Sequence, residues 1–128
     1  MSYFESVAEF HAKILRQDQP TPQLIDETSL LNRIRFMEEE IMELQTAYQL
    51  DDLAGVADAL ADLVYVALGT AYQMGVPFDA VWAAVHKANM TKARGVTKRG
   101  MAIDAVKPVD WVGPEAEITE ALYRAAKA

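Results

Sequence analysis

Apolar positions in this chain recur with helical spacing along most of its length. Between residues 26 and 50 they alternate in steps of four and three, which places them on one core-facing stripe: Leu30, Ile34, Met37, Ile41, Leu44 and Tyr48. Asp26 or Thr28 can serve as the N-cap of this helix. No alternating apolar and polar run is long enough to predict a strand. The pattern predicts an all-α fold.

Two further helices follow from residues that begin or end helices. The first is predicted from Tyr3 to about Gln17, before Pro20. Another is predicted from about Asp52, a plausible cap, to Met74, with Gly75 as the left-handed stop.

The last third of the chain has a weaker pattern. A helix is predicted from Phe78 or Asp79 to near Arg94-Gly95. Residues 95–113 hold three glycines and a proline without a clear period, so we predict mostly loop. Gly113-Pro114 then opens a short helix through about Ala126, with Pro at its first position.

We expect a single domain over residues 1–128, built as a four- to five-helix bundle. The helix predicted from Asp52 to Met74 is apolar around most of its circumference, which suggests burial against a second copy of the chain. Asp62, Gln73 and Pro77 favour a buried core helix over a membrane span. Without cysteines or a recognisable secretory signal, we expect a cytoplasmic protein.

Charge is distributed unevenly along the chain. The net charge is −7, yet residues 87–107 hold one acid and six bases: Lys87, Lys92, Arg94, Lys98, Arg99 and Lys107. These bases are either ordinary solvated surface or a segment that closes over a polyphosphate. The acidic balance of the whole chain argues against general binding to nucleic acid.

Carboxylates occur on two neighbouring predicted helices. Glu40 and Glu43 share a stripe beside the core stripe, and Glu39 can reach Glu43 at i+4. Asp58 and Asp62 share a stripe on the next helix, and antiparallel packing would gather these acids at one point. Hard oxygen ligands of this kind suit Mg²⁺ or Mn²⁺. The alternative is that either cluster is a solvated helix face.

The acidic motif and the helix that follows it resemble those of a known superfamily. Glu39-Glu40-Ile41-Met42-Glu43 matches the Glu-Glu-x-x-Glu motif of the MazG-like all-α nucleoside triphosphate pyrophosphohydrolases. The stretch DALADLVYVALGTAYQMGVPFDAVWAAVHKANMTKA, followed by a Lys-Pro and a Trp, looks like the phosphoribosyl-ATP pyrophosphohydrolase-like branch. The resemblance covers roughly residues 30–112.

The resemblance implies a set of metal ligands. By position these are Glu40, Glu43 and Asp62, with Glu39 a further ligand or the group that orients the attacking water. The superfamily's second motif, Glu-x-x-Asp, would place an acid at position 59, where this chain has Ala. Asp58, on the same stripe as Asp62, can take its place.

The resemblance also implies an activity. It is metal-dependent hydrolysis, with Mg²⁺ or Mn²⁺, of the α–β phosphoanhydride of a nucleoside triphosphate to a monophosphate and pyrophosphate, with Glu39 and Glu40 as catalytic residues. The nucleotide would be contacted by Tyr65, Asn89, Lys92, Lys98 and Lys107. A homodimer or homotetramer is expected, without nucleic-acid or membrane partners. The alternatives are a phosphoribosyl-ATP pyrophosphohydrolase and a non-catalytic nucleotide-binding helical protein.

Overall fold

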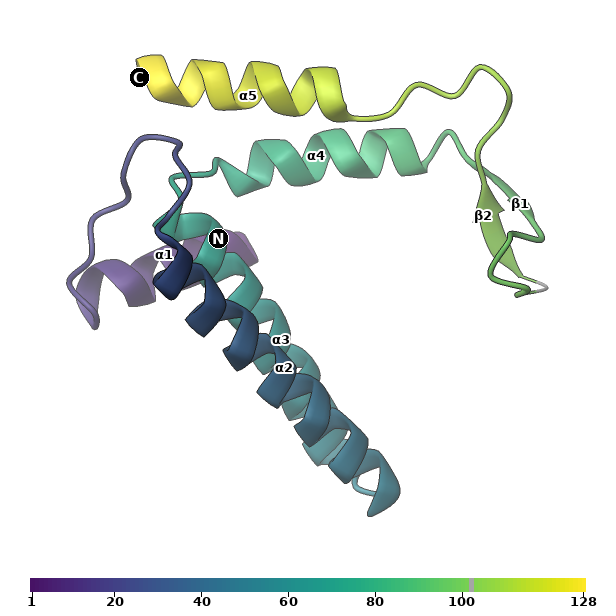
Figure 1. Cartoon of the computed structure of the whole chain (residues 1–128), viewed down its shortest axis with the longest axis horizontal. Helices are drawn as coiled ribbons and strands as arrows, with labels where there is room; N and C mark the ends of the chain where they lie inside the picture. Colours follow the sequence, from purple (N-terminus) through teal and green to yellow (C-terminus); the bar gives the residue numbers. More distant parts are fainter. Residues whose placement is uncertain (102) are drawn as a thin grey trace. The chain divides into compact units, whose positions relative to one another are not determined.

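The computed structural model describes residues 1–101 and 103–128, and these residues form five helices and one two-stranded sheet (Figure 1). The predicted all-α fold is confirmed. The chain divides into two compact units, unit 1 (residues 1–78) and unit 2 (residues 79–128). That residues 1–128 act as one domain stays a prediction. The elements are α1 (Tyr3–Lys13), α2 (Glu27–Gln49), α3 (Leu53–Gln73), α4 (Phe78–Asn89), β1 (Ala93–Gly95), β2 (Asp104–Val106) and α5 (Glu115–Lys127).

The helix starts in unit 1 follow the sequence closely. Asp26 caps α2 and Asp52 caps α3, each through its side chain, and Gly75 has the positive φ (68°) expected of a helix stop. Ser2 and Glu5 form a capping box at α1. The predicted end of α1 at Gln17 is wrong by four residues, because the chain leaves the helix after Lys13.

Helices α2 and α3 form a helical hairpin in which the two helices lie side by side (Figure 1). Three residues, 50–52, connect them, so the helices run antiparallel. Arg33 of α2 links the pair: its Nε donates to Thr70 Oγ1 and its Nη2 to Val66 O, both at 3.0 Å. These bonds fix the register in which the two helices face each other.

The core of unit 1 lies between α1 and α3. Phe4 and Val7 of α1 pack against Leu68 and Tyr72 of α3, and the Phe4 ring also contacts Phe78, with 6.0 Å between centroids. This is an ordinary aromatic and aliphatic cluster that docks the short α1 helix on the hairpin.

Much of α3 is uncovered in the isolated chain. Among the described residues, α3 is the one helix long and apolar enough to cross a membrane by length and composition, a test that core helices of other proteins also pass. Only 17% of that apolar stretch is buried within the chain. The expected absence of a membrane partner stays a prediction.

In unit 2, α4 ends at Asn89, five residues before the predicted end near Arg94. The reason is that Ala93–Gly95 enters β1, which pairs antiparallel with β2 in the register Arg94 opposite Ala105. The expectation that this segment contains no strand is therefore wrong. At the start of α5, Pro114 is the cap rather than the first helical residue.

Asp104 organises the turn between the two strands. Its carboxylate accepts hydrogen bonds from Thr97 Oγ1 (2.6 Å) and from the backbone N–H of Ala105, and pairs with Arg99 at 2.7 Å. The Thr97 bond is the largest cause that lowers the pKa of Asp104, to about 2 from an ordinary 3.8; the Ala105 and Arg99 bonds act in the same direction. Arg99, being paired, is less available to a phosphate than the neighbouring Lys98.

A pH-dependent contribution to stability follows from this lowered pKa. Because the folded pKa lies below the unfolded one, the contribution is fully present above pH 3.8 and disappears as the pH falls towards 2. Asp104→Asn should therefore lower the free energy of unfolding at pH 7, and its difference from wild type should shrink between pH 3.8 and 2. Urea unfolding followed by tryptophan fluorescence measures this, since Trp82 and Trp111 both lie in unit 2. A difference independent of pH would contradict the assignment.

Candidate functional site

Three carboxylates meet on the seam between α2 and α3. Glu40 and Glu43 stand one turn apart on α2, and Asp62 faces them from α3. One ligand oxygen from each lies within 4.8 Å of the others. Glu40 and Asp62 are partly buried, whereas Glu43 is exposed. We call Glu40, Glu43 and Asp62 the acidic triad.

Glu40 is the least satisfied member of the acidic triad. Its Oε2 is shielded from solvent and accepts no hydrogen bond, which is unfavourable for a carboxylate oxygen. Burial raises the pKa of Glu40, and the negative charges of Glu43, Asp62 and Asp58 raise it further. The protein groups around Glu40 therefore oppose its ionisation.

Within the described residues, no lysine, arginine or histidine lies within ion-pair distance of the acidic triad. A divalent cation would satisfy Glu40 Oε2 and offset the repulsion among the three carboxylates. The donor set, three hard oxygens with one side open to solvent through Glu43, fits Mg²⁺ or Mn²⁺. The residues present thus fit a site for a divalent metal ion.

A polar cluster braces the same seam about 10 Å further along α2, two helical turns from Glu40. Arg33 is held there by Thr70 and Val66, and burial lowers its pKa. His11 of α1 is 2% exposed; its Nδ1 lies 2.9 Å from Gln17 Oε1, and its ring lies against Tyr72. Gly69 leaves the space that the tips of His11 and Arg33 occupy.

The structure brings together only part of the predicted ligand set. Asp58 is exposed and is not one of the three triad residues, although its charge still acts on Glu40. Glu39 is exposed on α2, and its role stays a prediction. Ala59, where the superfamily motif has an acid, is buried at 2% exposure.

The predicted nucleotide-binding residues fall in both units. Tyr65 lies in unit 1, where its ring meets Phe10 edge to face. Asn89 is the last residue of α4 and is exposed, as is Lys98. The ammonium groups of Lys92 and Lys107 lie 5.2 Å and 4.9 Å from the ring centroid of Trp111. Their roles in binding stay predictions.

With this geometry in view, comparison with known sequences decides the family. A profile of the family described as phosphoribosyl-ATP pyrophosphohydrolase matches residues 7–89, more than half of the chain. The chain belongs to the phosphoribosyl-ATP pyrophosphohydrolase family. The predicted MazG-like all-α superfamily is thereby confirmed. A search of curated proteins found no match.

Membership in the phosphoribosyl-ATP pyrophosphohydrolase family implies a pyrophosphohydrolase, that is, a hydrolase acting on acid anhydrides of a nucleotide. The matched range contains the acidic triad and the polar cluster around Arg33. It stops at the end of α4, so the strands, Trp111 and α5 lie outside it.

Sequence reasoning missed Arg33 and His11. Arg33 sits beside the core stripe of α2, and no acid stands three or four positions away to mark it as paired. Its partners are a hydroxyl and a carbonyl 37 and 33 residues away. Because these partners are distant in the sequence, helical periodicity cannot predict them.

Proposed function

We propose that this protein is a metal-dependent pyrophosphohydrolase that cleaves the α–β phosphoanhydride of a nucleoside triphosphate, releasing a nucleoside monophosphate and pyrophosphate. The observation that carries the proposal is the acidic triad with its unsatisfied Glu40 oxygen, in a chain of this family. Glu40, Glu43 and Asp62 would hold Mg²⁺ or Mn²⁺. When bound, the ion supplies positive charge that offsets the anionic phosphates.

We assign the remaining chemistry to the other residues predicted from the sequence. Glu39 accepts the proton of the attacking water as its oxygen forms a bond to the α-phosphorus. The bond from that phosphorus to the α–β bridging oxygen breaks, and pyrophosphate leaves. Lys92, Lys98 and Lys107 favour the departure by compensating its charge. In this proposal Asp58 adds negative charge that attracts the cation, and Tyr65 and Asn89 contact the nucleotide.

Phosphoribosyl-ATP is a second candidate substrate, because the family description names it. A panel assay of pyrophosphate release separates the candidates: common and deoxy nucleoside triphosphates and phosphoribosyl-ATP, each with Mg²⁺, Mn²⁺ or EDTA. We expect release that requires a divalent ion and is fastest with one member of the panel. Release only from phosphoribosyl-ATP would select the second candidate. No release from any member would support a non-catalytic nucleotide-binding protein.

We also propose that two copies of the chain pair through α2 and α3. Large apolar side chains are exposed on both helices in the isolated chain: Leu31, Ile34 and Ile41 on α2, and Leu60 and Val64 on α3. Large exposed apolar patches mark sites of protein–protein contact. Light scattering should give the mass of two or four chains, and a monomer at micromolar concentration would contradict the pairing.

A further inference from the structure

Contacts between α2 and α3 repeat every seven residues along both helices. In antiparallel order from the connection outwards, the facing pairs are Ala47 with Gly55, Glu40 with Asp62, and Arg33 with Gly69. Seven residues make nearly two helical turns, so successive pairs lie about 10 Å apart along the seam. The acidic triad therefore lies between two other contacts of the same helix pair.

At both outer contacts the two helices approach closely over a glycine of α3. A Cβ atom on Gly55 would lie 3.1 Å from Ala47 Cβ, and one on Gly69 would lie 2.6 Å from Arg33 Nη2. Near Gly55 the three-residue connection itself keeps the helices together. At the other outer contact, Arg33 joins them through its side chain.

The middle contact acts against this close approach. The three carboxylates of the acidic triad place ligand oxygens within 4.8 Å of one another, and like charges at this separation repel. Apolar packing has no preferred direction, so it resists a small rotation of one helix against the other only weakly. A directional contact is needed to keep Asp62 facing the two glutamates.

Arg33 makes such a directional contact. Its Nε and Nη2 leave the planar guanidinium at a fixed angle and donate to Thr70 Oγ1 and Val66 O, each at 3.0 Å. Thr70 is buried, and its hydroxyl donates its own hydrogen to Val66 O at 2.8 Å. The lone pairs of that hydroxyl are therefore left to accept from Arg33.

We propose that Arg33 is a positioning residue for the metal site. Its guanidinium, held by Thr70 and Val66, fixes α2 against α3 so that Asp62 faces Glu40 and Glu43 before an ion binds. The inference rests on the proposed function, because it requires that the acidic triad hold the ion. Arg33 acts through the acidic triad and not on the ion itself.

Two substitutions of Thr70 test the proposal, with Mn²⁺ binding followed by electron paramagnetic resonance without nucleotide. Thr70→Val keeps the shape of the side chain but removes the acceptor of Arg33 Nε, whereas Thr70→Ser keeps the hydroxyl. Thr70→Val should weaken Mn²⁺ binding about tenfold, the lower end of the effect seen for groups that orient metal ligands. Thr70→Ser should change it less than twofold. Equal affinities of the two variants would overturn the proposal.

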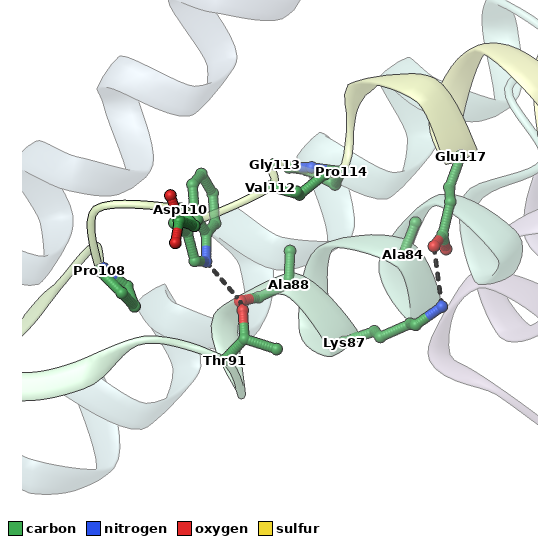
Figure 2. A pocket seen from close by; sticks show the side chains of 11 residues that line it. Ala84, Lys87, Ala88, Thr91, Pro108, Asp110, Val112, Gly113, Pro114 and Glu117 are labelled. Carbon is green, nitrogen blue, oxygen red and sulfur yellow. Dashed lines mark hydrogen bonds and ion pairs between the residues drawn. The ribbon is translucent and has the colours of Figure 1, made fainter.

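A matched control in unit 2 separates positioning from a general loss of stability. The Thr91 hydroxyl also donates to a helix carbonyl, Ala88 O, at 2.6 Å (Figure 2). Thr91→Val should leave Mn²⁺ affinity unchanged, with circular dichroism confirming that every variant is folded. Weakening by Thr91→Val as large as that by Thr70→Val would refute the role of Arg33.

Arg33→Met gives a test in which the two possible causes have opposite signs. Removing a positive charge about 10 Å from Glu40 would by itself strengthen the binding of a cation. Loss of the hydrogen bonds to Thr70 and Val66 should instead weaken Mn²⁺ binding about tenfold. Unchanged or tighter binding would overturn the proposal.

The wild-type measurement keeps the two proposals apart. If wild type binds Mn²⁺ saturably and both Thr70→Val and Arg33→Met bind it equally well, this inference fails and the proposed metal site stands. If wild type shows no saturable binding, both fall.

Discussion

Asp62→Asn should lower kcat for the best substrate by at least about 1,000-fold, since loss of a metal ligand removes several kcal/mol of charge stabilisation at about 1.4 kcal/mol per factor of ten. The substitution keeps the shape of the side chain but removes its charge from the acidic triad. Glu43→Gln should lower kcat by a similar factor. The assay is steady-state pyrophosphate release at saturating Mg²⁺, with circular dichroism to confirm unchanged helicity.

The matched control for this prediction is Glu38→Gln. Glu38 is an exposed glutamate of the same helix that does not belong to the acidic triad. Its substitution should change kcat less than twofold. An Asp62→Asn enzyme that retained a tenth of wild-type activity, or a Glu38 variant equally impaired, would assign catalysis to other residues.

Gly69→Ala should destabilise the protein by about 2 kcal/mol, although alanine is the better helix former. A Cβ at this position would lie 2.5 Å from His11 Nε2 and 2.6 Å from Arg33 Nη2. His11 is buried and Arg33 is held by two hydrogen bonds, so relief requires both side chains to move and weakens the bonds they make. Urea denaturation followed by circular dichroism measures the loss.

A double-mutant cycle tests whether crowding against Arg33 is the cause. Gly69→Ala should lower the free energy of unfolding clearly less in an Arg33→Ala background, because one of the two colliding side chains has been removed. Additive losses would mean that Arg33 is not the obstacle. A stabilising Gly69→Ala substitution would mean that His11 and Arg33 are not held as the structure shows.

The parts of this fold that the sequence predicted are those set by local chemistry. Asp26, Asp52 and Gly75 mark helix ends through their own side chain or backbone, and each does so in the structure. The three-residue spacing of Glu40 and Glu43 placed both on one face of α2. Helix ends that depend on partners were predicted less well: α4 stops at Asn89, and the following Ala93–Gly95 pairs with Asp104–Val106 instead of continuing the helix.

The candidate site was predictable only where helical spacing within one element determines the position of a side chain. Helical periodicity brought Asp62 opposite the glutamates, but it placed Asp58 on the same stripe and could not tell which would face them. One position on a helix turns a side chain by about 100°, so small differences in packing decide this. The bracing by Arg33 and His11, and the indole with its two lysines, join segments that no local pattern connects.

The most direct test of the metal site is Mn²⁺ binding measured by electron paramagnetic resonance on wild type and Asp62→Asn in the absence of nucleotide. The acidic triad predicts saturable binding to wild type, at least tenfold weaker binding to Asp62→Asn, and unchanged binding to Glu38→Gln. Equal Mn²⁺ affinity in wild type and Asp62→Asn would show that these three carboxylates do not form the metal site.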